Sequence, residues 1–250
     1  MSHTPLPLRA RSATEIVDAA FQLYRRDPLT YLLVAAVCYA PILVLQLITL
    51  GPATDNIEEQ LARLTAGYSM VMLFGYWVSI SLMSSVIIRL SSEDYLGRKI
   101  EPAVAVRDAV MRLPTVMIAF LLKYILMIIG FFLFIVGLLY MVARYFAVTS
   151  AIILEGRGVF TSFGRSAVLS RGRKGHILGT LLLAFLIFIV VYFAVTILAA
   201  ATGSTVITTV LSVAASIVAY PMFAITEMLL YYDARVRNEG YDIEMMAEGL

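Results

Sequence analysis

Apolar runs of about 20 residues alternate with short charged segments along the whole chain. An α-helix rises 1.5 Å per residue, so about 20 residues cross the roughly 30 Å of hydrocarbon in a bilayer. The pattern predicts an all-α, polytopic membrane helical bundle with about six transmembrane helices. The predicted spans are residues 29–50, 68–90, 115–134, 138–154, 176–200 and 205–232.

The third and fourth spans come from one apolar stretch, residues 114–154, which is too long for a single crossing. No polar turn divides it, and we expect a tight turn near Gly137. Pro41 and Pro221 fall inside the first and sixth spans, where neighbouring helices can satisfy the freed carbonyl groups.

An amphipathic helix is predicted before the first span. Ser12 and Glu15 have the spacing of a capping box, and Ile16, Ala20 and Leu23 follow on one face. Rougher versions of this pattern occur at residues 102–113 and 158–171. We expect these helices to lie in the inner membrane interface with their basic residues toward anionic headgroups. The alternative, which is compatible with the first, is that they pack on one another as a cytoplasmic cap.

The basic residues are distributed asymmetrically, which predicts the orientation. Sixteen of them lie in the N-terminal segment, the second and fourth loops and the tail, whereas the alternate loops hold only Arg63. By the positive-inside rule both termini are cytoplasmic and the loop Asp55–Ala66 faces outward. The chain is then one membrane domain, residues 1–250, with a cytoplasmic amphipathic segment (1–28), a six-span bundle (29–232) and a cytoplasmic tail (233–250). The sixteen residues are Arg9, Arg11, Arg25, Arg26, Arg89, Arg98, Lys99, Arg107, Arg112, Arg157, Arg165, Arg171, Arg173, Lys174, Arg235 and Arg237.

The composition supports membrane insertion and offers little chemistry. Hydrophobic residues make up 61% of the 250, against roughly 45–50% in soluble domains, and no stretch remains for a separate soluble catalytic domain. A single cysteine, Cys38, and two distant histidines, His3 and His176, provide no disulfide and no metal-site pattern. Nucleophile-elbow, phosphate-loop and dinucleotide-binding motifs do not occur. We therefore expect no catalytic residue, no cofactor, no metal and no nucleic-acid partner.

Three ionisable residues fall inside the predicted spans: Lys123, Arg144 and Glu227. At 1.5 Å per residue they lie roughly 14, 15 and 8 Å deep. Charges at these depths should face the protein interior or water and be paired. They predict a cytoplasm-facing polar cavity with an anionic or lipid guest, in which Arg144 faces Glu227. The alternative is structural: Lys123 extends to the interface and Arg144 pairs with Glu227.

A second group of polar residues lies at the cytoplasmic ends of the fourth and sixth spans. Opposite charges at matching heights predict a charge cluster that holds both spans to the helix following the fourth span. Its members are Glu155, Arg165, Ser166, Asp233 and Arg235.

Three motifs resemble the glycerophosphoryl diester phosphodiesterase membrane-domain-like family of prokaryotic membrane proteins. The resemblance covers nearly the whole chain and implies a six-helix bundle in a prokaryotic cytoplasmic membrane. Some family members carry a phosphodiesterase domain, for which this chain has no room, and the Pro-Gly usual between spans three and four is here Ile135-Val-Gly137. The motifs are residues 154–158 (LEGRG), residues 165–172 (Arg165-Ser166, then LSRG) and residues 230–240 (LYYDARVRNEG).

These observations favour a non-enzymatic membrane protein, either transporter-like or lipid-interacting, whose partners are membrane lipids of the anionic inner leaflet. The alternatives are an enzyme acting on lipid headgroups and a structural partner of another membrane protein. An enzyme would need a nucleophile and a base in one polar pocket, and no clear base accompanies Glu155, Ser166 or Asp233.

Overall fold

The computed structural model describes residues 7–50, 66–98 and 101–241, and the regular elements in these ranges are all α-helices. The predicted outward loop lies outside the described residues, except for Ala66. The helices are α1 (Ala13–Arg26), α2 (Pro28–Leu50), α4 (Ala66–Tyr95), α5 (Pro102–Phe132), α6 (Phe134–Arg144), α7 (Val148–Glu155), α8 (Val159–Leu169), α9 (Lys174–Ala200) and α10 (Thr205–Glu239).

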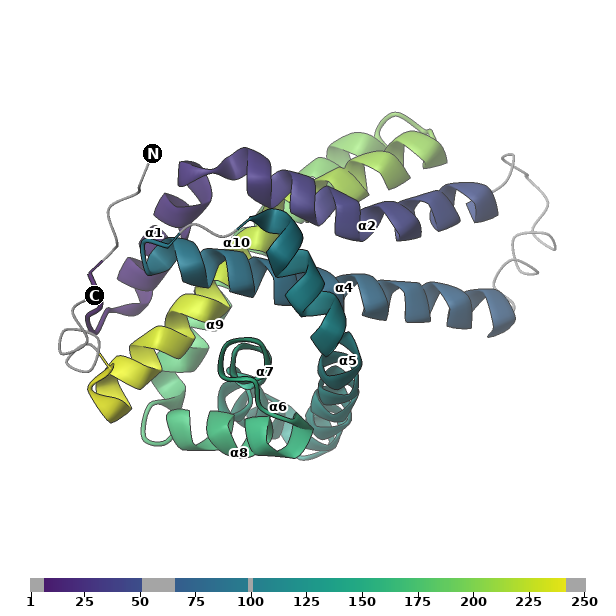
Figure 1. The fold of residues 1–250 in the computed structure, drawn as a ribbon. Helices are drawn as coiled ribbons and strands as arrows, with labels where there is room; N and C mark the ends of the chain where they lie inside the picture. The colour runs from purple at the N-terminus through teal and green to yellow at the C-terminus, as the bar shows by residue number, and fades with distance from the viewer. Residues whose placement is uncertain (1–6, 51–65, 99–100, 242–250) are drawn as a thin grey trace.

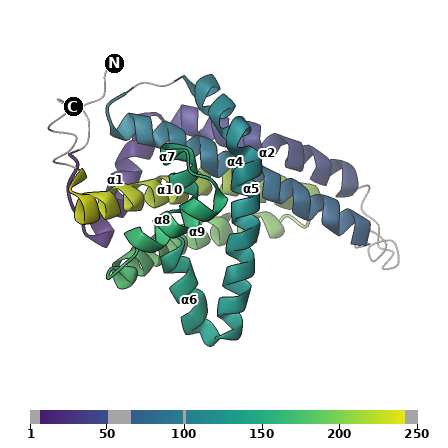
Figure 2. The same ribbon diagram turned by 60° about the horizontal axis from the view of Figure 1, so that its bottom comes forward.

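Six segments are long and apolar enough to cross a membrane, which confirms the predicted all-α bundle and makes the chain an integral, multi-pass membrane protein. Five are the helices α2, α4, α5, α9 and α10, and the sixth combines α6 and α7. Three hairpins, α2–α4, α5–α6 and α9–α10, diverge from one end of the molecule (Figure 1). Figure 2 shows the α5–α6 hairpin projecting away from the direction of α2 and α4.

Polar and charged contacts gather where α1, α8 and the last turns of α10 meet, and we call this the charged end. The region around the turn between α9 and α10 lies away from the charged end, and we call it the hairpin end. Helix α10 forms the core toward the charged end, because its residues 221–234 are buried apart from the partly exposed Phe223. The polar side chains of a helix buried on all sides need hydrogen-bond partners within the protein, on the helix itself or on a neighbouring element.

Helix α1 begins with the predicted capping box. The Ser12 hydroxyl accepts the Glu15 amide at 3.3 Å, and the Glu15 carboxylate accepts the Ser12 amide at 2.8 Å. Hydrogen bonding to the Ser12 backbone, and then to Arg9, lowers the pKa of Glu15 to about 2. The apolar face, including Ile16 and Leu23, is buried against α9 and α10. Helix α1 is therefore packed against two spans of the bundle, and its placement in the membrane interface stays a prediction.

The second predicted amphipathic helix is not a separate element. Residues 102–113 form the first turns of α5, which continues through Pro114 to Phe132. Proline is tolerated inside a transmembrane helix when surrounding groups satisfy the carbonyl it leaves free. Likewise α10 continues beyond the predicted end of its span at Tyr232 to Glu239.

The turn between the third and fourth spans lies at Leu133, earlier than the predicted Gly137. Gly137 instead sits inside α6 and packs against Gly130 of α5. A Cβ added to Gly130 would approach the carbonyl oxygen of Gly137 to 2.8 Å, and one on Gly137 would meet the carbonyl oxygen of Gly130. The missing side chains permit this backbone contact, as small residues do at other membrane helix interfaces.

Replacing Gly137 by alanine should destabilise the α5–α6 hairpin, because the new methyl group collides with the backbone carbonyl of Gly130, which moves less easily than the end of a flexible side chain. We expect a loss of about 1–3 kcal/mol, the usual cost of overpacking. Thermal unfolding in lipid nanodiscs measures it. Gly179→Ala is the matched control, since Gly179 is helical and has nothing within 4 Å of an added Cβ. Equal midpoints for both variants would contradict the close approach.

Candidate ligand cavity

A cavity of about 360 Å³ lies where the α5–α6 hairpin diverges from α9 and α10. Its walls are mainly apolar, with aromatic rings contributed by Phe120, Phe146, Phe185 and Phe223. Four polar side chains also line it: Lys123 and Tyr124 from α5, and Tyr220 and Glu227 from α10. An apolar cavity with a few polar groups is the usual form of a small-molecule site.

Glu227 is the most constrained of these polar groups, being only 7% exposed. Thr149 of α7 hydrogen-bonds to the carboxylate, and Lys123 attracts it electrostatically. The second carboxylate oxygen, Oε1, has no hydrogen-bond partner among the described residues. A buried polar atom left unpaired is costly and rare, so this oxygen marks a place where a ligand or water would be stabilising.

Arg144 does not face Glu227, contrary to the sequence expectation. Its guanidinium donates to the hydroxyl groups of Tyr140 at 3.0 Å and Tyr145 at 3.3 Å. Lys174, the first residue of α9, lies over the same Tyr140 ring, with its Nζ 5.1 Å from the centroid. Arg144 is therefore near the charged end. The sequence expectation assumed one straight fourth span, whereas α6 ends at Arg144 and the chain changes direction there.

The break between α6 and α7 exposes backbone groups that the fourth span would otherwise satisfy itself. Ser166 of α8 satisfies two of them: its hydroxyl accepts the Ala147 amide and donates to the Arg144 carbonyl, both at 3.0 Å. Irregular backbone within a membrane protein persists only where such partners exist. Ser166 thus belongs to the helix break and not to the predicted charge cluster.

The remaining cluster residues separate into two networks. In the first, Arg165 of α8 donates to Glu155 at 2.7 Å and to Glu239 at 2.8 Å, and Arg235 donates to Glu239 at 3.1 Å. Tyr231 donates to Glu155 at 2.7 Å. Hydrogen bonds to Glu239, and then to Glu155, raise the pKa of Arg165. This network connects α7, α8 and α10.

Asp233 lies in the second network, apart from Glu155 and Arg235. Its carboxylate accepts the Arg11 amide at 2.8 Å and the Arg237 guanidinium at 2.8 and 2.9 Å, and the His176 ring lies 3.3 Å away. Residues advance about 100° around a helix, so Asp233 points away from its neighbours two positions on either side. The second network fastens the N-terminal segment to α10.

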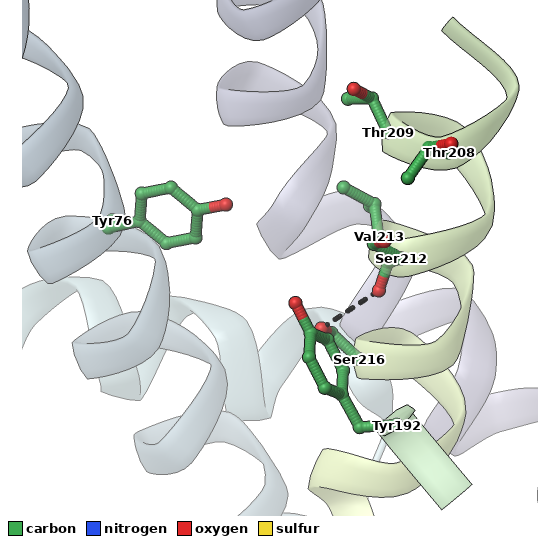
Figure 3. A pocket seen from close by; sticks show the side chains of 7 residues that line it. All are labelled: Tyr76, Tyr192, Thr208, Thr209, Ser212, Val213 and Ser216. Atoms are coloured by element: carbon green, nitrogen blue, oxygen red, sulfur yellow. Dashed lines mark hydrogen bonds between the residues drawn. The ribbon is translucent and has the colours of Figure 1, made fainter. Parts of the chain in front are cut away.

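A second pocket, of about 180 Å³, lies toward the hairpin end between α4, α9 and α10. Figure 3 shows hydroxyl-bearing side chains around it and the hydrogen bond from the Ser216 hydroxyl to the Ser212 carbonyl, 3.0 Å long. No charged side chain lines this pocket. Its lining residues are Tyr76, Tyr192, Thr208, Thr209, Ser212, Val213 and Ser216.

Sequence reasoning overlooked Tyr124, Tyr220 and Glu239. Helical spacing offers a signal for two of them. Tyr220 precedes Glu227 by two turns on one face, and Glu239 follows Arg235 by four residues, the spacing of an ion pair on a helix surface. Tyr124 carries no comparable signal.

Comparison of the chain with protein-family models, curated proteins and solved structures finds no match. The resemblance to the glycerophosphoryl diester phosphodiesterase membrane-domain-like family therefore stays a prediction from its motifs.

Ser166→Ala should destabilise the fold, because the Ala147 amide and the Arg144 carbonyl lose their partner while remaining buried. The expected cost is about 1–3 kcal/mol by thermal unfolding in nanodiscs. Ser162→Ala is the matched control: Ser162 is buried on the same helix, but its hydroxyl donates only within α8, to Val159. A larger loss at Ser162 than at Ser166 would refute the bridging role.

Double-mutant cycles should distinguish the two possible partners of Glu227. Lys123→Met and Glu227→Gln should be coupled by about 0.5–3 kcal/mol, because both line one cavity. Arg144→Met and Glu227→Gln should be additive within about 0.5 kcal/mol, since they share no partner. Unfolding of the single and double variants in nanodiscs provides both values. Strong coupling in the Arg144 cycle would instead show that Arg144 and Glu227 interact, as the sequence analysis expects.

Proposed function

We propose that this integral membrane protein is a transporter-like, lipid-interacting bundle whose cavity binds an amphiphile. The observation that carries the proposal is the unpartnered Glu227 oxygen in an apolar-walled cavity. The walls suit hydrocarbon, and the carboxylate requires a hydrogen-bond donor. An amphiphile with a donor group in its head supplies both.

The cavity mouth supports entry from the bilayer. Tyr124 and Phe185 line the cavity and are also 50% and 47% exposed, although both lie within predicted spans. Phe185 is about 16 Å along α9 from Lys174 at 1.5 Å per residue. Side chains exposed at such depth face lipid, so we propose a lateral opening in place of the cytoplasm-facing one expected from the sequence.

The charges define the head of the amphiphile. Arg144 does not line the cavity, so the positive charge of Lys123 and the negative charge of Glu227 balance there. These two side chains favour a head group with both an acceptor and a donor, such as a phosphate and an amine or hydroxyl. A purely anionic guest is no longer favoured there.

Arg144 and Lys174 suit the anionic lipids expected as partners. Both cations lie over the Tyr140 ring, and in the described part of the chain the Arg144 guanidinium binds tyrosine hydroxyls and no carboxylate. Basic and aromatic residues together are typical of the headgroup region. With both termini in the cytoplasm, this surface meets the inner leaflet of a prokaryotic cytoplasmic membrane.

The test is the identity of lipid retained by the protein. Native mass spectrometry after detergent-free extraction should show one enriched lipid class in the wild type. Glu227→Gln and Lys123→Met should reduce its retention by about tenfold or more, since a hydrogen bond to a charged group contributes about 1.5–3 kcal/mol.

Glu101→Gln and Arg107→Met are matched controls, because both side chains are exposed and Glu101 makes no capping hydrogen bond. They should retain the wild-type lipid. The same lipid composition in the wild type and all four variants would refute the cavity as a lipid site.

A further inference from the structure

One face of α10 lines both cavities in succession. Ser212 and Ser216 border the hydroxyl-lined pocket, and Tyr220 and Glu227 border the ligand cavity. Steps of four and seven residues keep side chains on the same face of a helix. Ser212 and Glu227 are about 22 Å apart along the axis, which is most of the hydrocarbon thickness of roughly 30 Å.

Tyrosine hydroxyls occupy the region between the two cavities. Tyr39 of α2 hydrogen-bonds to Ser216, and its ring lies 6.2 Å from the Tyr76 ring, edge to face. Tyr220 hydrogen-bonds to Ser84 of α4 and lies close enough to Tyr39 and Glu227 to interact with both electrostatically. Hydroxyl-bearing side chains therefore lie along the interval between the two cavities, where Tyr39 is hydrogen-bonded to Ser216 and Tyr220 to Ser84.

We propose that this row of hydroxyl groups is a proton path that connects the hairpin end of the bundle to Glu227. The row consists of Ser212, Ser216, Tyr39, Tyr220 and Glu227.

The chemistry needs no partner beyond water. A hydroxyl group or water molecule accepts a proton on its oxygen and releases another to the next oxygen, so each relay group returns to neutrality. At the end of the row the unpartnered Oε1 of Glu227 takes up the proton and the carboxylate becomes a neutral acid, which returns to the carboxylate by releasing the proton to water in the ligand cavity. The hydroxyl-lined pocket has room for roughly six water molecules at about 30 Å³ each.

Glu227 is suited to this role by what surrounds it. Lys123 and Tyr124 face it from α5, Thr149 from α7 and Tyr220 from its own helix. Buried carboxylates within spans commonly serve as proton relays. The inference rests on the proposed function, in which the proton would be the ion coupled to movement of the amphiphile.

The experiment measures proton entry into vesicles of phosphatidylethanolamine and phosphatidylglycerol that hold the full chain. A pH gradient is imposed, valinomycin and potassium remove the membrane potential, and an internal dye reports pH. The wild type should exceed empty vesicles, and Glu227→Gln should return to their level. Tyr39→Phe and Ser216→Ala should each slow entry by about tenfold, equivalent to roughly 1.4 kcal/mol in barrier height.

Tyr24→Phe and Ser162→Ala are the matched controls, because their hydroxyls donate to the backbone carbonyls of Val218 and Val159 and to no hydroxyl of the row. Both should retain wild-type entry, and thermal unfolding confirms that every variant is folded. Wild-type entry equal to that of empty vesicles overturns the path, as does wild-type entry in both Tyr39→Phe and Ser216→Ala. If lipid retention depends on Glu227 but no proton entry is seen, the proton path is overturned and the lipid cavity is retained. Proton entry without selective lipid retention supports the path and overturns the lipid cavity.

Discussion

Burial of α10 on all sides toward the charged end is the constraint on which the other elements depend. A helix in this position cannot send a polar side chain to water, so each polar side chain needs a partner within α10 or on a neighbouring element. Asp233 is satisfied by the Arg11 amide of the N-terminal segment and by Arg237 of α10 itself, and the His176 ring of α9 lies 3.3 Å away. Tyr231 is satisfied by Glu155 of α7. These contacts of α10 thereby help to position the N-terminal segment that precedes α1, helix α7 and the start of α9.

The two charge networks differ in what they connect because they lie on different sides of α10. Tyr231, Arg235 and Glu239 repeat every four residues and face α7 and α8, whereas Asp233 and Arg237 face α9 and the N-terminal segment. Partly buried, bidentate arginine–carboxylate contacts are more directional than exposed pairs. They hold the charged end together while the three hairpins diverge from it.

Divergence of the hairpins accounts for the cavity. The α5–α6 hairpin is held tightly within itself by the contact of Gly130 with Gly137, but it departs from α9 and α10 near Phe185 and Phe223. The apolar walls left there would be stabilised by hydrocarbon. Glu227 is the one α10 carboxylate with an oxygen that no described residue satisfies. The cavity therefore combines apolar walls with one carboxylate oxygen that lacks a hydrogen-bond partner.

The sequence by itself determined the six spans and the capping box of α1, because hydrophobic length and cap spacing are local properties. It also brought Glu155 and Arg165 together correctly, since they are close along the chain. Only the tertiary structure decided that Glu227 interacts with Lys123 and that Arg144 binds tyrosine hydroxyls instead. The reason is physical: a helix break changes the direction of the side chains near it, and the hydroxyl that stabilises this break belongs to Ser166, on another helix.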